Sequence, residues 1–157
     1  MMPRVFLVTP YAEVVDSAAM ASKFYSWLHR PNVIFAQHCM ADCLKRDESV
    51  FASHLLYTQP GVLDDDQADE RHLGLIAGRR FMAVCDKAVC YVDRGISSGM
   101  RGDLEEALRL KTAINFRRLD GGMVGGTFLH THSVPHWPCG LCGYSLVEAV
   151  KAKAVAR

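Results

Sequence analysis

The stretch CDKAVCYVDRGISSGMRGDLEEALRL, residues 85–110, decides the fold. Residues 88–92 form a short apolar run with two valines and a tyrosine, which is typical of a buried strand. Two glycines and two serines follow within residues 94–99 and predict a turn. From Met100 to Leu110, leucine and alanine recur at helical spacing. The stretch therefore predicts a strand, a loop and a helix, in that order.

The junction between this strand and this helix has the features of a small-molecule site. Asp93 stands where the strand should end, and Ser97 or Ser98 can cap the helix by accepting a hydrogen bond from an early N–H group. In α/β folds, ligands bind beyond the carboxyl ends of the strands. The free N–H groups and the dipole of the helix favour an anion there.

Working outward, the remaining chain alternates between strand and helix patterns. A strand at residues 4–8 ends at Thr9-Pro10, because proline cannot donate to a sheet ladder. Further strands are expected at 50–53 and 112–117, and helices at 12–29, 33–46 and 67–84. This alternation predicts an α/β fold of three layers, a doubly wound and mostly parallel sheet of 4–5 strands, flavodoxin-like or Rossmann-like.

Two patterns, one within the helix at 33–46 and one just before the helix at 67–84, allow more than one interpretation. Cys39 and Cys43 lie four residues apart beside His38; we favour small apolar thiols facing the core over a metal site. The acidic run at residues 64–66 is expected to be a solvated helix start rather than a metal site.

The helix at 67–84 should pack through an apolar face, and two glycines four residues apart, Gly74 and Gly78, would allow a close approach to the sheet. The residues expected on that apolar face are Leu73, Ile76, Ala77, Phe81 and Val84.

Composition narrows the function classes. The chain has 157 residues, half of them hydrophobic, and a formal net charge of +1, which suits one domain with a substantial core. No basic stripe or membrane-length apolar run stands out, so neither nucleic acid nor a membrane is an expected partner. The first residues lack the pattern of a signal peptide, and we expect a cytoplasmic protein with reduced cysteines.

The end of the chain stands apart from the predicted domain at 1–118. Residues 119–157 contain a glycine-rich linker, a His/Cys-rich segment and an amphipathic helix expected at 145–156. Cys139 and Cys142 have the spacing of structural zinc ligands. The other two ligands would come from His130, His132 and His136, with His132 and His136 favoured. A loop with two reduced thiols and no metal is the alternative.

Five segments of the chain, taken in order, resemble the nucleoside 2-deoxyribosyltransferase-like superfamily, and in particular a small branch from phages and bacteria. They are VFLVTPYA, FASHLLYTQ, LDDD…ERHLGL, CDKAVCYVD and ISSGMRGDLEEA, and the resemblance spans residues 4–118. It implies cleavage of the bond between a base and its sugar. In that family a glutamate attacks C1′, and water or another base then takes the sugar.

The resemblance also implies roles for particular positions. Asp93 corresponds to an aspartate that orients the base, and Tyr11 to an aromatic residue beside the substrate. Ser97, Ser98 and Gly99 correspond to the loop near the sugar or its 5′-phosphate. The position of the nucleophile holds Asp103 rather than glutamate. A misplacement of ~1 Å can cost ~100-fold in rate.

The substitution of Asp103 leaves two functions open. The first is an enzyme that cleaves or transfers at the N-glycosidic bond of a nucleoside or nucleoside 5′-monophosphate, with Asp103 and Asp93 as a carboxylate pair. The second is a nucleotide-binding or regulatory protein on the same fold. His54, in a polar segment after the second strand, is expected to contact the substrate. No cofactor is required for catalysis, and the resemblance implies a homodimer or larger assembly.

Overall fold

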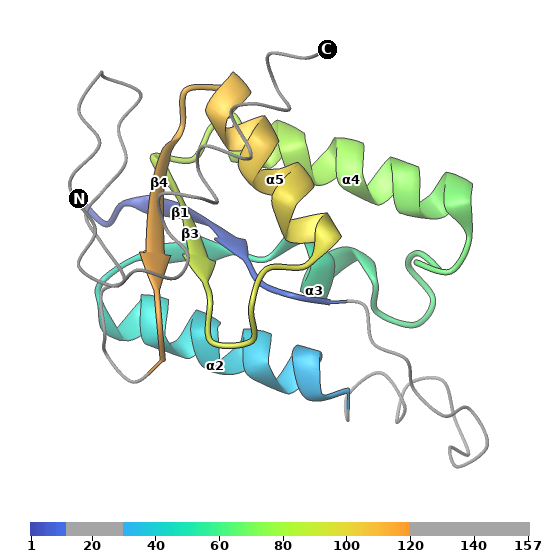
Figure 1. Cartoon of the computed structure of the whole chain (residues 1–157), viewed down its shortest axis with the longest axis horizontal. Helices are drawn as coiled ribbons and strands as arrows, with labels where there is room; N and C mark the ends of the chain where they lie inside the picture. The colour runs from blue at the N-terminus through green and yellow to red at the C-terminus, as the bar shows by residue number, and fades with distance from the viewer. Residues whose placement is uncertain (12–29, 120–157) are drawn as a thin grey trace.

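The computed structural model describes residues 1–11 and 30–119, which form an α/β unit (Figure 1). Its elements in chain order are β1 (Arg4–Val8), α2 (Pro31–Lys45), β2 (Ser49–Phe51), α3 (Ser53–Tyr57), α4 (Ala68–Met82), β3 (Lys87–Tyr91), α5 (Ser98–Arg109) and β4 (Ala113–Arg117). The predicted helix at 12–29 and the whole segment 120–157 lie outside the described residues.

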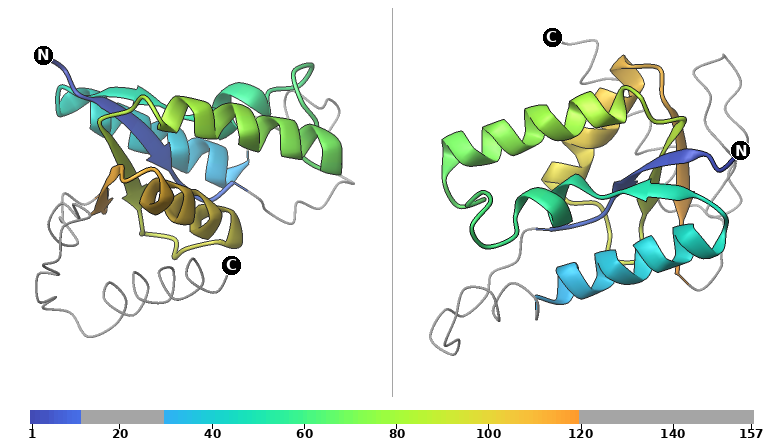
Figure 2. Two further views of the ribbon diagram at one scale, coloured as in Figure 1. Left: turned by 90° about the horizontal axis from the view of Figure 1, so that it is seen from above. Right: turned by 180° about the vertical axis from the view of Figure 1, so that it is seen from behind.

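The four strands form one parallel sheet in the order β2-β1-β3-β4. Helix α2 lies on one face of the sheet, and α4 and α5 lie on the other (Figure 2). Strand β2 lies on one side of β1 in the sheet and β3 lies on its other side, so the loops that follow β1 and β3 lead in opposite directions. In such sheets, this divergence creates a crevice at the carboxyl ends of the strands.

Alternation along the strands divides the core into two layers. On the α4 and α5 face, Phe6 and Cys90 pack against Met100 and Leu104 of α5. On the α2 face, Leu7 and Tyr91 pack against α2 residues that include Val33, Phe35, Cys39 and Cys43. Cys39 and Cys43 are fully buried, which confirms the prediction that these thiols face the core.

The predicted fold class is confirmed, and every expected strand within the described residues is present, with ends shifted by no more than two residues. Helix α3 was not predicted from the sequence. Residue 53 was expected to end the second strand, and the residues from His54 onward to form a polar segment, but Ser53–Tyr57 form a short helix beside α4.

The expected packing of α4 was wrong. Leu73, Ile76, Phe81 and Val84 are exposed, and the buried positions of this helix are Gly78 and Met82. A Cβ atom on Gly78 would lie 2.9 Å from Cβ of Ser53, so the helix approaches α3 closely through its glycine face. Gly78 thus allows the close approach that the glycine spacing predicted, chiefly to α3, while Leu73, Ile76 and Val84 stay exposed and Met82 is the large side chain that α4 buries.

A buried ion cluster ties β4 to the start of β2. Arg117 donates two hydrogen bonds of 2.6 Å to the carboxylate of Glu48, and Lys87 Nζ lies 2.5 Å from the same group. Burial alone would raise the pKa of Glu48, but these hydrogen bonds and charges lower it to about 2. The cluster therefore stabilises the sheet across its strands.

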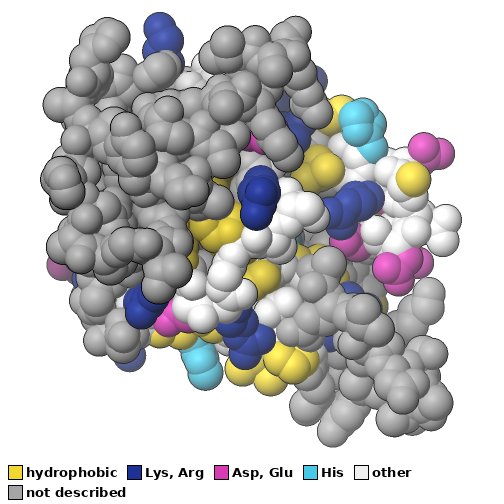
Figure 3. All heavy atoms as spheres, in the orientation of Figure 1, with side chains coloured by type: hydrophobic (Ala, Val, Ile, Leu, Met, Phe, Trp, Pro, Cys, Tyr) yellow, Lys and Arg dark blue, Asp and Glu magenta, His cyan; other side chains and the backbone are white. Residues whose placement is uncertain are grey.

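The charge pattern of the surface and the length of the helices bear on the expected partners. On the face shown in Figure 3, basic and acidic side chains of the described residues lie close together and do not form a stripe of one sign. No helix among the described residues is long and apolar enough to cross a membrane.

Candidate functional site

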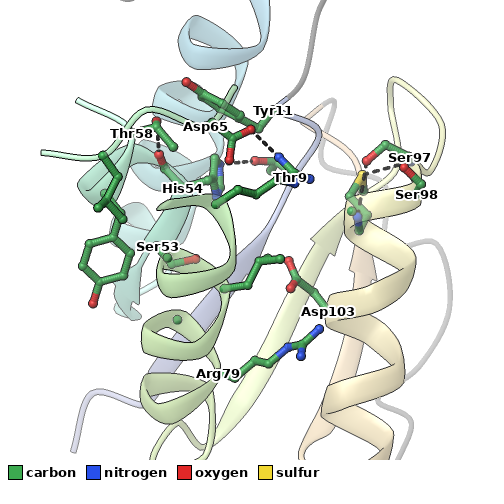
Figure 4. A pocket seen from close by; sticks show the side chains of 18 of the residues that line it. Thr9, Tyr11, Ser53, His54, Thr58, Asp65, Arg79, Ser97, Ser98 and Asp103 are labelled. Carbon is green, nitrogen blue, oxygen red and sulfur yellow. Dashed lines mark hydrogen bonds and ion pairs between the residues drawn. The ribbon is translucent and has the colours of Figure 1, made fainter. Parts of the chain in front are cut away.

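The crevice at the diverging loops contains a cavity of about 110 Å³. Its walls come from the loop after β1, from α3, from the inner face of α4 and from the first turns of α5 (Figure 4). Five of the predicted binding residues, Tyr11, His54, Ser97, Ser98 and Gly99, line it, together with the predicted nucleophile Asp103. The structure therefore brings together residues from three separate segments of the sequence.

A second cavity of about 400 Å³ lies next to the first and shares wall residues with it, among them Tyr11 and Asp65. Ligand sites in proteins commonly enclose about 300–1,000 Å³. The first cavity, which we call the inner cavity, is thus too small for a whole nucleotide and has the size of one part of such a ligand; we call the second the outer cavity. A larger ligand would place its remainder in the outer cavity.

Tyr11 and His54 form the polar and aromatic wall of the inner cavity. Their ring centroids are 6.1 Å apart, and His54 Nε2 lies 2.8 Å from the hydroxyl of buried Thr9. Burial lowers the pKa of His54 to about 4, so the imidazole is neutral near pH 7. Arg30 donates a hydrogen bond of 3.2 Å to the Tyr11 hydroxyl, and its guanidinium carbon lies 5.7 Å from the centroid of the Tyr11 ring.

The amino terminus of α5 faces the same cavity. Ser97 caps the helix, because its Oγ accepts a hydrogen bond of 3.3 Å from the backbone N–H of Met100. The preceding turn relies on Gly95, whose φ of +74° is a conformation that glycine adopts without strain. The cap uses the N–H of Met100, and the N–H groups of Ser98 and Gly99 occupy the first helical positions, where helices bind anions.

Asp103 is one turn further along α5, on the side that faces α4. Burial raises the pKa of its carboxyl to about 6, and the positive charges of Arg79 and Arg71 offset only part of this effect. At pH 7 the carboxylate is ionised, in a half-buried position that disfavours its charge. A titratable group whose pKa is perturbed in this way within a cavity is a frequent mark of a functional site.

Arg71 and Arg79 are wall residues that the sequence analysis did not identify. Arg71 forms an ion pair with Asp65, and its Nη2 would lie 3.8 Å from a Cβ atom on Gly99. Arg79 points toward Asp103 (Figure 4). Within the described part of the chain, its Nε is buried without a hydrogen-bond partner. Both arginines lie on the same face of the helix as Gly74 and Gly78, and this spacing in the sequence could have indicated that they face the cavity.

Asp93, the predicted partner of Asp103, is not among the described residues that line the cavity. Its Oδ1 accepts a hydrogen bond of 3.0 Å from the backbone N–H of Leu119, and its charge acts on Cys39 of α2. The reason is the alternation of β3. Cys90 points toward α5, whereas Tyr91, two residues before Asp93, points toward α2.

The predicted zinc ligands Cys139, Cys142, His132 and His136 lie outside the described residues. Within residues 1–11 and 30–119, no group of three or more potential ligands is placed to hold a metal ion. The acidic run at 64–66 lines the outer cavity, and its Asp65 also lines the inner one and forms an ion pair with Arg71.

Comparison with protein families adds one finding. A family model described as a domain of unknown function, DUF7768, matches residues 3–117. The chain belongs to this family. The matched residues comprise the four strands and contain Tyr11, His54 and the amino-terminal half of α5 with Asp103, so the DUF7768 unit includes both walls of the cavity. A search of curated proteins found no match.

Proposed function

We propose that this DUF7768 protein cleaves or transfers at the N-glycosidic bond of a nucleoside 5′-monophosphate or nucleoside, with the Asp103 carboxylate as nucleophile. The observation that carries this proposal is that one cavity holds an ionised carboxylate, the amino terminus of α5 and an aromatic wall. These three features match the three parts of the substrate: the sugar carbon, the phosphate and the base.

In the first step, a carboxylate oxygen of Asp103 forms a bond to C1′ of the sugar. The bond between C1′ and the base nitrogen breaks, and its electron pair leaves with the base, which takes up a proton from solvent water. In the second step, water or another base attacks C1′ and releases the carboxylate. Positive charge develops on the sugar during both steps, and a carboxylate beneath C1′ stabilises it.

The other cavity walls suit the remaining parts of the substrate. Ser98 and Gly99 offer N–H groups to a 5′-phosphate, and Arg71 lies beside them with positive charge. Tyr11 and the neutral His54 offer ring faces to the base, which would extend into the outer cavity. We assign no chemical step to Asp93, because its carboxylate accepts a hydrogen bond from the Leu119 N–H and does not line the cavity.

A second function, nucleotide binding without turnover, is favoured by one observation. Asp103 is shorter by one methylene than the glutamate of the resembling family, and a displacement of ~1 Å can cost ~100-fold in rate. The same cavity would then hold a nucleotide without attacking it.

The test is incubation with a panel of deoxynucleosides, ribonucleosides and their 5′-monophosphates, with chromatographic detection of free base. We expect release from monophosphates to exceed release from the matching nucleosides. Ser98→Ala removes a hydroxyl from the cavity wall and should weaken substrate binding without abolishing it, because the helix keeps its N–H donors. If no member of the panel loses its base but monophosphates raise the melting temperature, the binding function replaces the enzymatic one.

A further inference from the structure

The outward face of α4 carries an apolar stripe with no packing partner in the described structure. The stripe consists of Asp69, Leu73, Ile76, Arg80 and Val84, and we call it the α4 stripe. Leu73 is 57% exposed, Ile76 38% and Val84 55%. Two large aliphatic side chains near the centre of a helix and a third just beyond its end thus face solvent, where they gain nothing from burial.

Local rearrangement cannot bury the stripe. The opposite face of α4 is fixed by Gly78, where a Cβ atom would lie 2.9 Å from Cβ of Ser53. A rotation that turned Leu73 or Ile76 inward would push large side chains into this contact. The stripe is therefore a surface that only another molecule, or another segment of this chain, can cover.

The spacing of the stripe specifies what kind of surface covers it. Its first four residues are separated by four, three and four positions, which is the seam spacing of helices that pair side by side. The two central positions are aliphatic. The outer two carry opposite charges, negative at Asp69 near the start of α4 and positive at Arg80 near its end.

This arrangement is complementary to itself in one orientation. When two copies of α4 run antiparallel about a two-fold axis near residues 74 and 75, Leu73 faces Ile76 of the second copy. In the same register, Asp69 faces Arg80 of the second copy. Both pairs share one centre, so a single placement satisfies all four contacts, and the symmetry makes each contact twice. A parallel arrangement would instead bring like charges together.

We propose that the α4 stripe is a homodimer interface in which two copies of α4 pack antiparallel in this register. The family resemblance implied a homodimer or larger assembly without indicating the interface, and the α4 stripe is a candidate for that interface. The proposal does not depend on the chemistry at Asp103, because Arg71 and Arg79 leave α4 on its cavity side. Two helices of 15 residues bury a small area, so we expect association at micromolar rather than nanomolar concentrations.

The test is sedimentation equilibrium of the full chain and of its variants. Ile76→Glu places two carboxylates at the centre and should leave only monomer, with an unchanged circular dichroism spectrum because Ile76 touches solvent in the monomer. Ile34→Glu on α2, an exposed residue on the opposite face of the sheet, is the matched control and should leave the association constant unchanged.

Charge exchange tests the register. Asp69→Arg or Arg80→Asp alone turns two attractive pairs into repulsive ones and should weaken association about tenfold or more. The double variant Asp69→Arg with Arg80→Asp should restore it. A parent chain that stays monomeric at its highest soluble concentration overturns the proposal and leaves the stripe to another partner. A dimer that survives Ile76→Glu, or a double variant as weak as the single ones, overturns it as well.

Discussion

Replacing Asp103 with asparagine should make the protein more stable at neutral pH. Burial raises the pKa of this carboxyl from 3.8 to about 6, and a tenfold change in an acid dissociation constant corresponds to about 1.4 kcal/mol. The ionised carboxylate therefore lowers the free energy of unfolding by up to about 3 kcal/mol. Asparagine has nearly the same size and carries no charge, so Asp103→Asn should recover most of this amount.

The gain should depend on pH with a defined sign. The folded protein holds the Asp103 proton up to a pH of about 6, whereas the unfolded chain releases it near 3.8. Between these values the folded state binds more protons, so the stability of the parent falls as pH rises. The difference between Asp103→Asn and the parent should be near zero at pH 3.8 and complete above pH 6, as measured by urea unfolding at a series of pH values.

Glu106, one turn further along α5, is the matched control. Its carboxylate accepts hydrogen bonds of 2.9 and 2.6 Å from Arg109, and these lower its pKa. Glu106→Gln should therefore reduce stability slightly at neutral pH, the opposite sign to Asp103→Asn. If Asp103→Asn destabilises the protein at neutral pH, or stabilises it equally at all pH values, the carboxylate is well solvated or well paired in the folded protein, and the prediction is refuted.

Two further changes test the fold. Glu48→Gln should lower the free energy of unfolding by about 3 kcal/mol at pH 7, because it leaves Arg117 buried without its anion. In the parent, the stabilisation that Glu48 provides should disappear as pH falls from 4.5 to about 2. The control is Asp86→Asn, which breaks an exposed ion pair with Arg4 and should cost much less stability in the same unfolding assay. Gly78→Ala should destabilise the protein by ~1–3 kcal/mol in thermal unfolding, because its new Cβ would lie 2.9 Å from Cβ of Ser53. Gly74→Ala should cost less, because its Cβ would meet only the flexible end of the Leu63 side chain, at 3.2 Å. Equal effects of the two changes would contradict the packing described for α4.

The sequence predicted the sheet because buried parallel strands leave short apolar runs bounded by turn residues. The run ending at Thr9-Pro10 and the strand before Asp93 were both placed correctly. The sequence did not predict which face of α4 is buried. Apolar periodicity favoured Leu73 and Ile76, but close approach through Gly78 is a packing effect between segments that lie far apart in sequence.

The candidate site was predictable to the extent that topology determines it. Parallel strands bring their carboxyl ends together, so Tyr11, His54 and Asp103 were expected around one crevice, and all three line it. The direction of Asp93 was not predictable from its place at the end of a strand, because the strand end fixes a position but not a face. Arg71 and Arg79 were missed because arginines on a helix usually face solvent.

The central claim is that the Asp103 carboxylate reacts at the sugar carbon. The most direct test measures base release from the best substrate of the panel by the parent and by Asp103→Ala, with Asp93→Asn beside them as a change to a carboxylate that does not line the cavity. The account predicts release by the parent and by Asp93→Asn, and none by a folded Asp103→Ala protein. Full release by Asp103→Ala would contradict it, because the nucleophile would then have to be another group.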